Sequence, residues 1–191
     1  MSAARRVLGI TGPPGAGKTT FAQAHVEALG STAVHVPMDG FHLADVTLAA
    51  RGLLDRKGAP ETFDAWGYAA LLRRCREETD HTVYAPGFDR DLEQPLAAAV
   101  AVDPEVEVVV TEGNYLLLDS PEWRAVRAAV DEIWYLDVPA DLRTERLVAR
   151  HVEFGKSEAA ARAWVAAVDT PNARLVAECL DRADRVVRPN R

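Results

Sequence analysis

The chain has 191 residues, of which 48% are hydrophobic and 27% charged, and its formal net charge at pH 7 is −7. This length and composition predict one domain with a hydrophobic core of its own. The excess of acidic residues argues against broad binding to nucleic acids or to anionic membranes.

The chain shows no sign of a membrane segment. No apolar run approaches the roughly 20 residues that span a bilayer, and the apolar run near the N-terminus is too short for a signal peptide. We therefore expect a cytoplasmic protein. In such a reducing compartment Cys75 and Cys179 are expected to be free, buried thiols.

The first third of the chain predicts two strands joined by a helix. Residues 6–11 (RVLGIT) have the composition of a strand, residues 17–29 predict a helix ended by Gly30, and residues 33–38 predict a second strand. Residues 41–60 mix glycine and proline with polar side chains and predict a surface excursion with one short helix.

The rest of the chain alternates strands with helices. Asp64 is the expected N-cap of a helix over 65–78. Strands are expected at 81–88, 106–113, 132–139 and 184–188, and helices from Pro121 and over 140–153, 157–168 and 171–182. This alternation predicts an α/β fold, a doubly wound parallel sheet with helices on both faces, in a single domain over residues 1–191. Ligands of such sheets bind at the carboxyl ends of the strands.

A phosphate-binding loop follows the first strand. Residues 12–19 (GPPGAGKT) match GxxxxGK[ST] between a predicted strand and a predicted helix, as this motif requires. Lys18, expected as a charge at the surface of the loop, would reach the β- and γ-phosphates of ATP, and the Thr19 hydroxyl would bind Mg²⁺. The candidate nucleotide-binding residues here are Gly12, Pro13, Pro14, Gly15, Ala16, Gly17, Lys18, Thr19 and Thr20.

The second strand ends in Asp39, within the stretch MDGFH. Because this strand follows the phosphate-loop helix, its last side chain should face the γ-phosphate. A carboxylate there could take the proton of an acceptor hydroxyl, contact Mg²⁺ through water, or simply form a turn. Of the three roles we favour the catalytic base. Gly40 is then expected to leave room for the acceptor and Phe41 to pack against it.

Two further groups complete the candidate site. Glu112 ends the most apolar strand, where it would hold Mg²⁺ directly or through water and lie close to the substrate. Arg143, Arg146 and Arg150 share one helix face because they are three and four residues apart. This face is either merely solvated or part of a helical lid at about residues 143–157 that binds the phosphates of ATP.

With these elements in place, the chain resembles the phosphoribulokinase/uridine kinase family of P-loop kinases. The resemblance rests on GPPGAGKTT, MDGFH, VYAPGFDRD, TEGNYLLL and ERLVARHVEFGK, which occur in the family's order over nearly the whole chain. The Asp-Gly-Phe after the second strand and the late AWVAAVDTPNARLV look closer to bacterial pantothenate kinases than to uridine kinases.

The resemblance implies roles for individual residues. It makes Asp39 the base, Arg146 the lid residue at the transferring phosphate, and Asn172 a contact of the acceptor. It also implies that the acceptor pocket is lined by Tyr84, Phe88, Asp89 and Arg90.

The resulting prediction is a kinase that uses ATP and Mg²⁺ to phosphorylate a hydroxyl of a nucleoside, a pantothenate-like molecule or a sugar. Basic residues near the expected pocket, such as Arg51 and Lys57, keep an anionic acceptor open, for example a nucleotide. The alternative is an ATP-binding regulatory NTPase without a small-molecule acceptor. A homodimer is among the states that the sequence allows.

Overall fold

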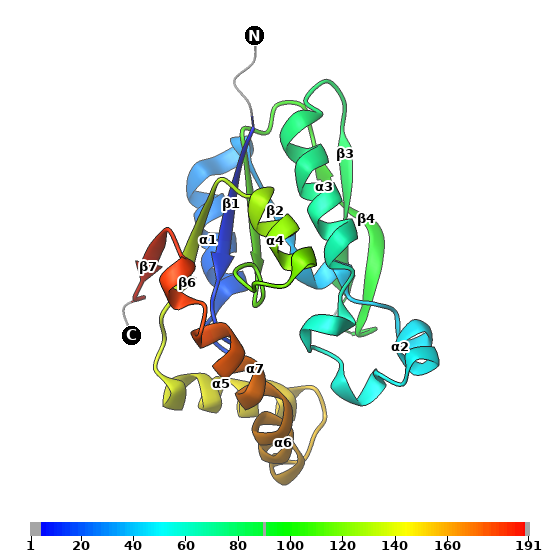
Figure 1. Cartoon of the computed structure of the whole chain (residues 1–191), viewed down its shortest axis with the longest axis vertical. Coiled ribbons are helices and arrows are strands. Elements are labelled where there is room, and N and C mark those ends of the chain that lie inside the picture. Colours follow the sequence, from blue (N-terminus) through cyan, green and yellow to red (C-terminus); the bar gives the residue numbers. More distant parts are fainter. Residues whose placement is uncertain (1–4, 90, 190–191) are drawn as a thin grey trace.

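Five parallel strands form the central sheet of the computed structural model, which describes residues 5–89 and 91–189. Their order is β2–β5–β1–β6–β7 (Figure 1). The strands are β1 (Arg6–Thr11), β2 (Ala33–Pro37), β5 (Val108–Gly113), β6 (Glu132–Leu136) and β7 (Arg185–Val187). Since β1, β5 and β6 are neighbours in register, Leu8 on β1 pairs with Val110 on one side and Glu132 on the other.

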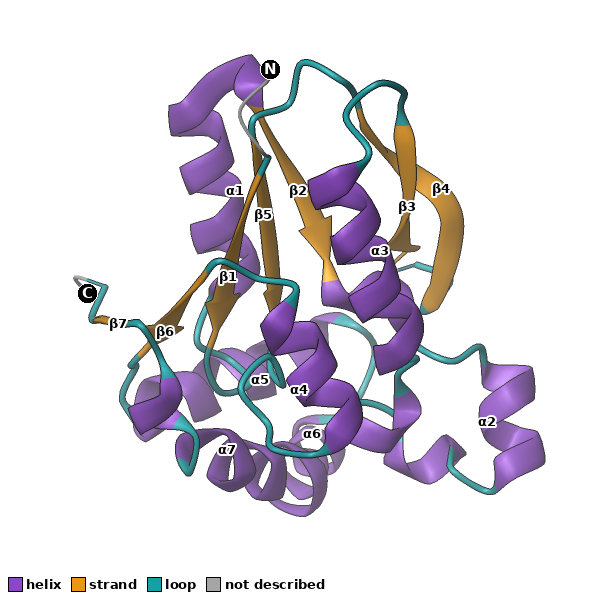
Figure 2. Ribbon diagram, turned by 45° about the horizontal axis from the view of Figure 1, so that its top comes forward, coloured by secondary structure: helices purple, strands orange, loops and turns teal. Residues whose placement is uncertain are grey.

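Helices cover both faces of this sheet, as the sequence predicts. Helix α1 (Lys18–Leu29) lies on one face, and α3 (Ala65–Glu77) and α4 (Pro121–Ala128) lie on the other (Figure 2). Side chains of a strand alternate between the two faces, so Leu8 and Ile10 pack with the residues of α1 and Val7 packs with those of α3 and α4. Asp64 caps α3 by accepting a hydrogen bond from the Gly67 N–H at 2.9 Å, which confirms the predicted N-cap.

A separate antiparallel hairpin lies beside β2 and consists of β3 (Val83–Asp89) and β4 (Gln94–Val102). The strand expected at 81–88 therefore exists, but it belongs to this hairpin and not to the parallel sheet. Strand β4 was not predicted. It is rich in alanine and mostly exposed, so it lacks the apolar alternation that indicates a half-buried strand.

Helices gather beyond the carboxyl ends of the parallel strands (Figure 1). They are α2 (Asp45–Arg51), α5 (Ala140–Glu153), α6 (Glu158–Trp164) and α7 (Thr170–Ala177), with a π-helical turn over Val165–Asp169 between the last two. Single 3₁₀ turns occur at Gly30–Thr32, Met38–Phe41, Leu54–Arg56, Pro60–Thr62 and Leu180–Arg182. The excursion that carries α2 is held to the core by backbone hydrogen bonds from Leu43 N to Thr62 O (2.9 Å) and from Asp64 N to Phe41 O (2.8 Å).

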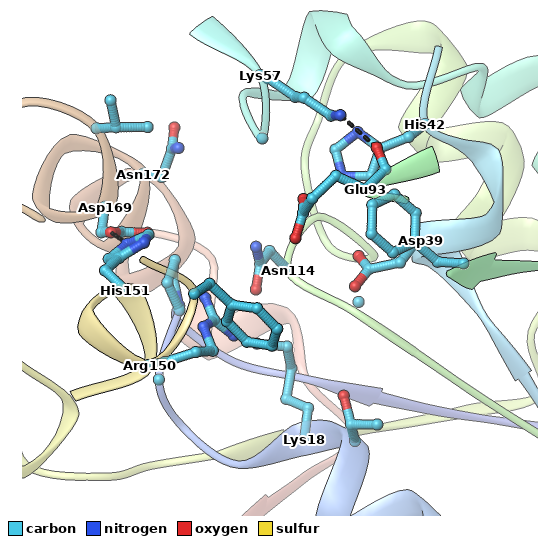
Figure 3. Close-up of a pocket in the computed structure, with 18 of the residues that line it drawn as sticks. Lys18, Asp39, His42, Lys57, Glu93, Asn114, Arg150, His151, Asp169 and Asn172 are labelled. Carbon is cyan, nitrogen blue, oxygen red and sulfur yellow. Dashed lines mark hydrogen bonds and ion pairs between the residues drawn. The ribbon is translucent and has the colours of Figure 1, made fainter. Parts of the chain in front are cut away.

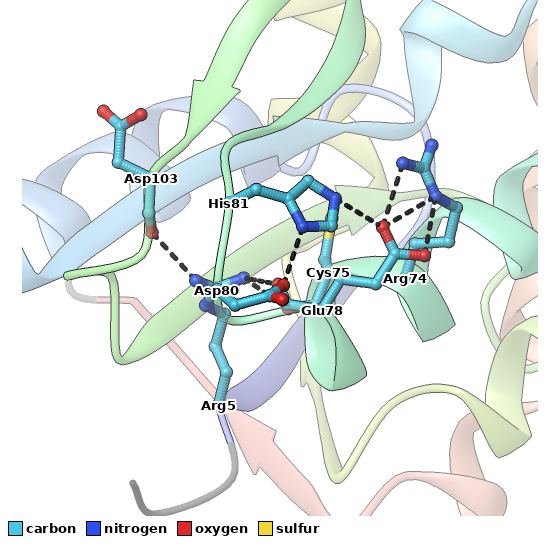
Figure 4. A network of polar contacts seen from close by, with 7 residues as sticks. All are labelled: Arg5, Arg74, Cys75, Glu78, Asp80, His81 and Asp103. Carbon is cyan, nitrogen blue, oxygen red and sulfur yellow. Dashed lines mark hydrogen bonds and ion pairs between the residues drawn. The ribbon is translucent and has the colours of Figure 1, made fainter.

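The amino ends of the strands are organised by one buried arginine. Arg5 is 2% exposed, and its guanidinium donates to the backbone carbonyls of Cys75 (2.6 Å) and Asp103 (2.8 Å) (Figure 4). It also donates to the carbonyl of Val106 (2.8 Å). These bonds satisfy a buried cation with backbone acceptors, which is one of the few ways in which a fold can hold such a charge. Arg5 thereby joins the start of β1 to the end of α3 and to the segment between β4 and β5.

Both cysteines are buried and free, as expected. Burial raises the pKa of the Cys75 thiol to about 11. Within the described residues, none of the helices combines the length and the apolarity that crossing a bilayer requires.

Candidate active site

The phosphate loop lies tightly packed between β1 and α1. Gly15 and Gly17 have φ angles of 78° and 82°, a left-handed conformation that side chains other than glycine rarely adopt. A Cβ at Gly12 would lie 2.8 Å from the Leu136 carbonyl oxygen, and one at Gly15 would lie 2.7 Å from that of Arg143. The glycines thus allow the loop to fit against the end of β6 and against α5.

Lys18 is buried, and the expectation that it is a charge at the surface of the loop is wrong. Its side chain folds back so that Nζ donates to the Pro13 carbonyl oxygen at 3.1 Å, and the residue is 8% exposed. Burial lowers the pKa of Lys18 to about 8, while the nearby carboxylates of Glu112 and Asp39 act in the opposite direction. The structure thus directs the positive charge into the protein, beside two acids, and not toward bulk water.

Glu112 lies beside the start of α1, at the end of β5. Its Oε1 accepts a hydrogen bond from the Thr19 hydroxyl at 3.1 Å and lies 3.7 Å from His35 Nε2 on β2, and the residue is only 4% exposed. The next residue, Gly113, leaves space for Met38, whose Sδ would come within 2.4 Å of an added Cβ. Met38 thereby closes over the end of β5 and brings the turn after β2 next to Glu112.

Thr19 and Glu112 fit a magnesium site. A hydroxyl that donates its proton to a carboxylate keeps its lone pairs for a cation, and hydroxyl and carboxylate oxygens are the hard ligands that Mg²⁺ prefers. In residues 5–89 and 91–189 there is no group of three or more His, Cys, Asp or Glu side chains that could hold a metal by itself. Mg²⁺ in kinase sites is bound by one or two carboxylates together with substrate phosphates, so this donor set suits it.

Asp39 lies in the 3₁₀ turn Met38–Phe41 that follows β2. It is half-buried and lines the same cavity as Lys18 and Glu112. A Cβ at Gly40 would lie 2.5 Å from the Pro86 carbonyl oxygen, so the glycine makes room for the β3 backbone and not for an acceptor. Phe41 packs on Tyr68, with ring centroids 4.8 Å apart, and is not among the residues that line the cavity.

The cavity has a volume of about 620 Å³ and opens at the carboxyl ends of the strands (Figure 3). It brings together most of the residues that the sequence nominates, namely Pro14, Gly15, Gly17, Lys18, Thr19, Thr20, Asp39, Phe88, Glu112, Arg150 and Asn172. Gly12, Pro13 and Ala16 belong to the same loop but lie behind its lining.

Three of the nominated acceptor contacts lie elsewhere or outside the described residues. Tyr84 is 60% exposed on β3 and does not line the cavity. Asp89 shapes the hairpin turn, because its Oδ1 accepts hydrogen bonds from the backbone N–H groups of Asp91 and Leu92, both at 2.9 Å. Arg90 lies outside the described residues.

The arginines of α5 divide into different roles. Arg143 donates to the Pro14 carbonyl oxygen at 3.3 Å and to that of Val138 at 3.1 Å, so it braces the phosphate loop. Arg146 is exposed, and its Nη1 lies 3.6 Å from the position of a Cβ on Gly17. Its guanidinium therefore lies beside the phosphate loop. One turn later, Arg150 reaches the lining of the cavity.

One wall of the cavity comes from the excursion and the hairpin. The ring of His42 packs between Phe63 and Phe88, with centroid distances of 3.9 and 5.4 Å. Lys57 donates to Asp45 Oδ1 at 2.8 Å and lies 5.9 Å from the centroid of the Phe88 ring. This wall presents aromatic surface and a lysine whose charge is already paired with a carboxylate.

The facing wall comes from α5, α6, the π-helical turn and α7. His151 Nε2 forms a hydrogen bond with Asp169 Oδ2 at 3.0 Å, and the His151 ring packs edge-on against Trp164 with the ring centroids 6.3 Å apart. Lys156 Nζ lies 5.0 Å above the Trp164 ring. Asn172 follows one helical turn after Asp169 and lines the same cavity.

The sequence reading missed several lining residues, among them Glu93, Asn114, Trp164 and Asp169. A signal existed for Asn114, which follows Glu112 and Gly113 directly beyond the end of a predicted buried strand. No comparable signal existed for Asp169, because helical periodicity through residues 157–182 does not reveal a π-helical turn.

Comparison with known proteins gives consistent results. The pattern of the phosphoribulokinase/uridine kinase family matches residues 7–190. A protein of Schizosaccharomyces pombe named "Putative uridine kinase" is 36% identical over 163 residues, which cover 79% of this chain and 68% of that protein. An Aspergillus versicolor protein named "ATP-dependent kinase-like protein" is 38% identical over 125 residues, covering 62% of this chain and 73% of that protein. Among solved structures, one described as a "putative fructose transport system kinase" from Silicibacter sp. superposes with a TM-score of 0.89 at 39% identity and covers 97% of this chain and 91% of its own.

Proposed function

This chain belongs to the phosphoribulokinase/uridine kinase family of P-loop kinases, and we propose that it transfers the γ-phosphate of MgATP to a hydroxyl of a small molecule. The observation that carries this proposal is that Lys18, Glu112 and Asp39 meet in one cavity at the carboxyl ends of β1, β5 and β2. A cation for phosphate, a carboxylate for the metal and a second carboxylate for the acceptor are the parts that phosphoryl transfer to a hydroxyl needs.

The ATP end of the cavity is formed by the phosphate loop. Its backbone N–H groups and Lys18 would hold the β- and γ-phosphates, with Arg146 and Arg150 beside them. Thr19 and Glu112 would hold Mg²⁺, which when bound neutralises charge on the phosphate oxygens. The Lys18 ammonium group would then contact phosphate oxygens and leave the Pro13 carbonyl. Charged phosphate oxygens are the stronger partners for an ammonium group.

Asp39 is the proposed catalytic base. It would accept the proton of the acceptor hydroxyl while the hydroxyl oxygen bonds to the γ-phosphorus and the bond to the bridging oxygen of ADP breaks. The half-buried position of Asp39 beside Lys18 supports this role. The packing of Gly40 against β3 also supports it, since a base must be held in place to act.

The acceptor is proposed to be a nucleoside, a sugar or a pantothenate-like molecule. The names of the fission-yeast relative and of the Silicibacter structure support the first two. The cavity extends past Asp39 toward His42, Phe63 and Phe88, and this aromatic wall could receive a base or the apolar face of a sugar.

Release of ADP with and without acceptors tests the proposal. Uridine, D-fructose, pantothenate and UMP are added one at a time. We expect at least one of them to raise the rate of ADP release above the acceptor-free rate and to give a phosphorylated product by mass spectrometry. In the presence of that acceptor, Asp39→Asn should lower kcat by about 10²- to 10⁴-fold with little change in the KM for ATP. The matched control is Asp181→Asn, an exposed acid outside the cavity, which should behave as wild type.

Two outcomes would contradict the proposal. Slow ATP hydrolysis that no acceptor stimulates would favour a regulatory NTPase. Full turnover by Asp39→Asn would show that Asp39 is a turn residue without a catalytic role.

A further inference from the structure

Asp169 is a buried carboxylate with unused hydrogen-bonding capacity. It is 8% exposed, and its Oδ2 is occupied by His151. Oδ1 has no hydrogen-bond partner among the described residues, yet Asp169 lines the cavity. A carboxylate offers about four acceptor positions. Oδ1 does not belong to the buried side-chain atoms that lack a partner, so its open positions can receive a donor from the cavity. Asp169 can therefore accept a further hydrogen bond from a molecule in the cavity.

The surrounding structure holds Asp169 in this orientation. The π-helical turn Val165–Asp169 ends at this residue, and Pro171 follows two residues later in the first turn of α7. His151, near the end of α5, forms a hydrogen bond with the carboxylate, and the His151 ring packs against Trp164. π-helical turns are rare and occur often at functional sites.

Figure 3 shows where this carboxylate lies relative to the proposed base. Asp169 and His151 are on one side of the cavity and Asp39 is on the other, with Asn114 between them. A molecule that presents one hydroxyl to Asp39 therefore has its far end directed toward Asp169 and Asn172.

The charges on the two walls favour an uncharged far end. Lys57 is neutralised by Asp45 at 2.8 Å, and Lys156 lies over the face of Trp164. The carboxylates of Glu93 and Asp169 both belong to the lining. Figure 3 places Glu93 with Lys57 and His42, so the carboxylate at the far end is that of Asp169. An anionic group there would approach this carboxylate, whereas a hydroxyl could donate a hydrogen bond to it.

We infer that Asp169 is a specificity-determining residue that accepts a hydrogen bond from a second hydroxyl of the acceptor, which is therefore a polyhydroxylated, uncharged molecule such as a sugar or a ribonucleoside. This inference rests on the proposed kinase function for the identity of the cavity. His151 is the positioning residue that orients Asp169, and Asp39 receives the hydroxyl that is phosphorylated.

Hydrogen bonds from hydroxyls to charged groups discriminate strongly. Leaving the buried partner unpaired adds to the loss, so a site built around a hydroxyl rejects the analogue that lacks it. We expect Asp169→Asn to weaken acceptor binding by about tenfold to a hundredfold. The affinity for ATP and the turnover rate of the bound acceptor (kcat) should change little.

Calorimetric binding in the presence of MgADP tests this without relying on turnover. The probes are D-fructose, uridine and 2′-deoxyuridine, with D-glycerate and pantothenate as anionic acceptors. At least one polyol should bind the wild-type protein more tightly than either anion does. Asp169→Asn should bind that polyol about tenfold to a hundredfold more weakly than the wild type. A deoxy analogue lacking the recognised hydroxyl should bind wild type weakly and lose little more with Asp169→Asn, because the two changes remove the same contact.

Control variants separate this role from a structural one. Glu153→Gln removes an exposed acid from the same lid, outside the cavity, and should bind as wild type. His151→Gln keeps a donor to Asp169 and should retain most of the affinity, while His151→Ala should lose part of it; this pair also serves if Asp169→Asn lowers the melting temperature too far.

The inference is overturned if Asp169→Asn binds the polyol as wild type does, or if only the anions bind, or if none of the polyols binds. A polyol that binds through Asp169 but is never phosphorylated would instead refute the proposed kinase function and leave this binding site standing.

Discussion

Lys18 carries its charge in a place from which water is largely excluded, and this should weaken the fold. Burial lowers the pKa of Lys18 to about 8, from about 10.5 for the exposed side chain. Below pH 8 both the folded and the unfolded protein bind the proton, and the folded one pays the full cost of burying it, on the order of 3 kcal/mol. We expect Lys18→Met to abolish ATP binding and yet to raise the melting temperature of the nucleotide-free protein by a few degrees at pH 7.

The pH dependence distinguishes this cause from a simple packing gain. Between pH 8 and pH 10.5 the unfolded chain binds more protons at this position than the folded protein, so the free energy of unfolding of the wild type rises with pH there. The stability advantage of Lys18→Met, measured by urea unfolding, should therefore be constant below pH 8 and shrink above it. An advantage that does not change with pH would refute the assignment to the buried charge.

At the level of single residues, the sequence predicted the phosphate end of the site better than the acceptor end. Lys18 and Thr19 belong to a contiguous motif, and Glu112 and Asp39 each follow a recognisable apolar strand. The lining beyond Asp39 comes from segments distant in the chain. Tyr84 was expected there from the family resemblance and Phe41 from its position after Asp39, whereas Asp169 had no local signal. Lys18 itself was expected to be exposed, because the motif does not show that the chain folds over its side chain.

The arginines of helix α5 differ in their surroundings, and we expect their substitutions to have different effects. Arg143 donates to the Pro14 carbonyl in the phosphate loop and to the Val138 carbonyl, whereas Arg146 lies beside Gly17. Arg146→Ala should lower kcat by about 10³-fold or more, as loss of a charge-stabilising arginine does, with little change in ATP affinity. Arg143→Ala should chiefly weaken ATP binding, since the loop loses its support.

Single-turnover kinetics and nucleotide titration measure these two effects separately. Arg162→Ala on α6, whose guanidinium pairs with Glu158 on the same exposed face, is the control and should leave both unchanged. Equal effects of Arg143→Ala and Arg146→Ala on kcat and on ATP affinity would mean that the helix acts as one unit.

Among the elements, those with strong periodicity were predicted and the irregular ones were not. The buried strand Val108–Gly113 and the amphipathic helix Ala140–Glu153 lie where the sequence placed them. Strand β4 was not predicted because it is rich in alanine and mostly exposed, and because its backbone is irregular, with φ of 55° at Ala98. Its pairing with β3 is a long-range property that local propensity does not contain.

At the scale of the whole molecule, the structure separates the candidate site from the group that organises the opposite end of the sheet. Arg5 donates to three carbonyl oxygens in two segments, and its loss would leave these acceptors without this donor. We expect Arg5→Met to lower the free energy of unfolding by about 2–5 kcal/mol. The KM values for ATP and acceptor, measured well below the melting temperature, should not change.

Arg6→Met is the matched control. The Arg6 side chain is 68% exposed and pairs with Glu132 at 3.5 Å, and exposed ion pairs contribute little. Urea unfolding should show a change of less than about 1 kcal/mol for this variant. Equal destabilisation by the two substitutions would mean that the network around Arg5 is not what holds this end together.

The π-helical turn Val165–Asp169 has a consequence for how this protein can change over evolutionary time. An α-helix advances by 100° per residue, so deleting one codon here would restore a regular helix and rotate the side chains beyond it by about that angle relative to α6. The wall of the cavity that α5, α6, the π-helical turn and α7 form would then present different groups, while the sheet, the phosphate loop and the proposed base stayed in place. If the proposed acceptor site is correct, a change in chain length alone would alter which acceptor this protein prefers, without any substitution in the phosphate loop or at the proposed base.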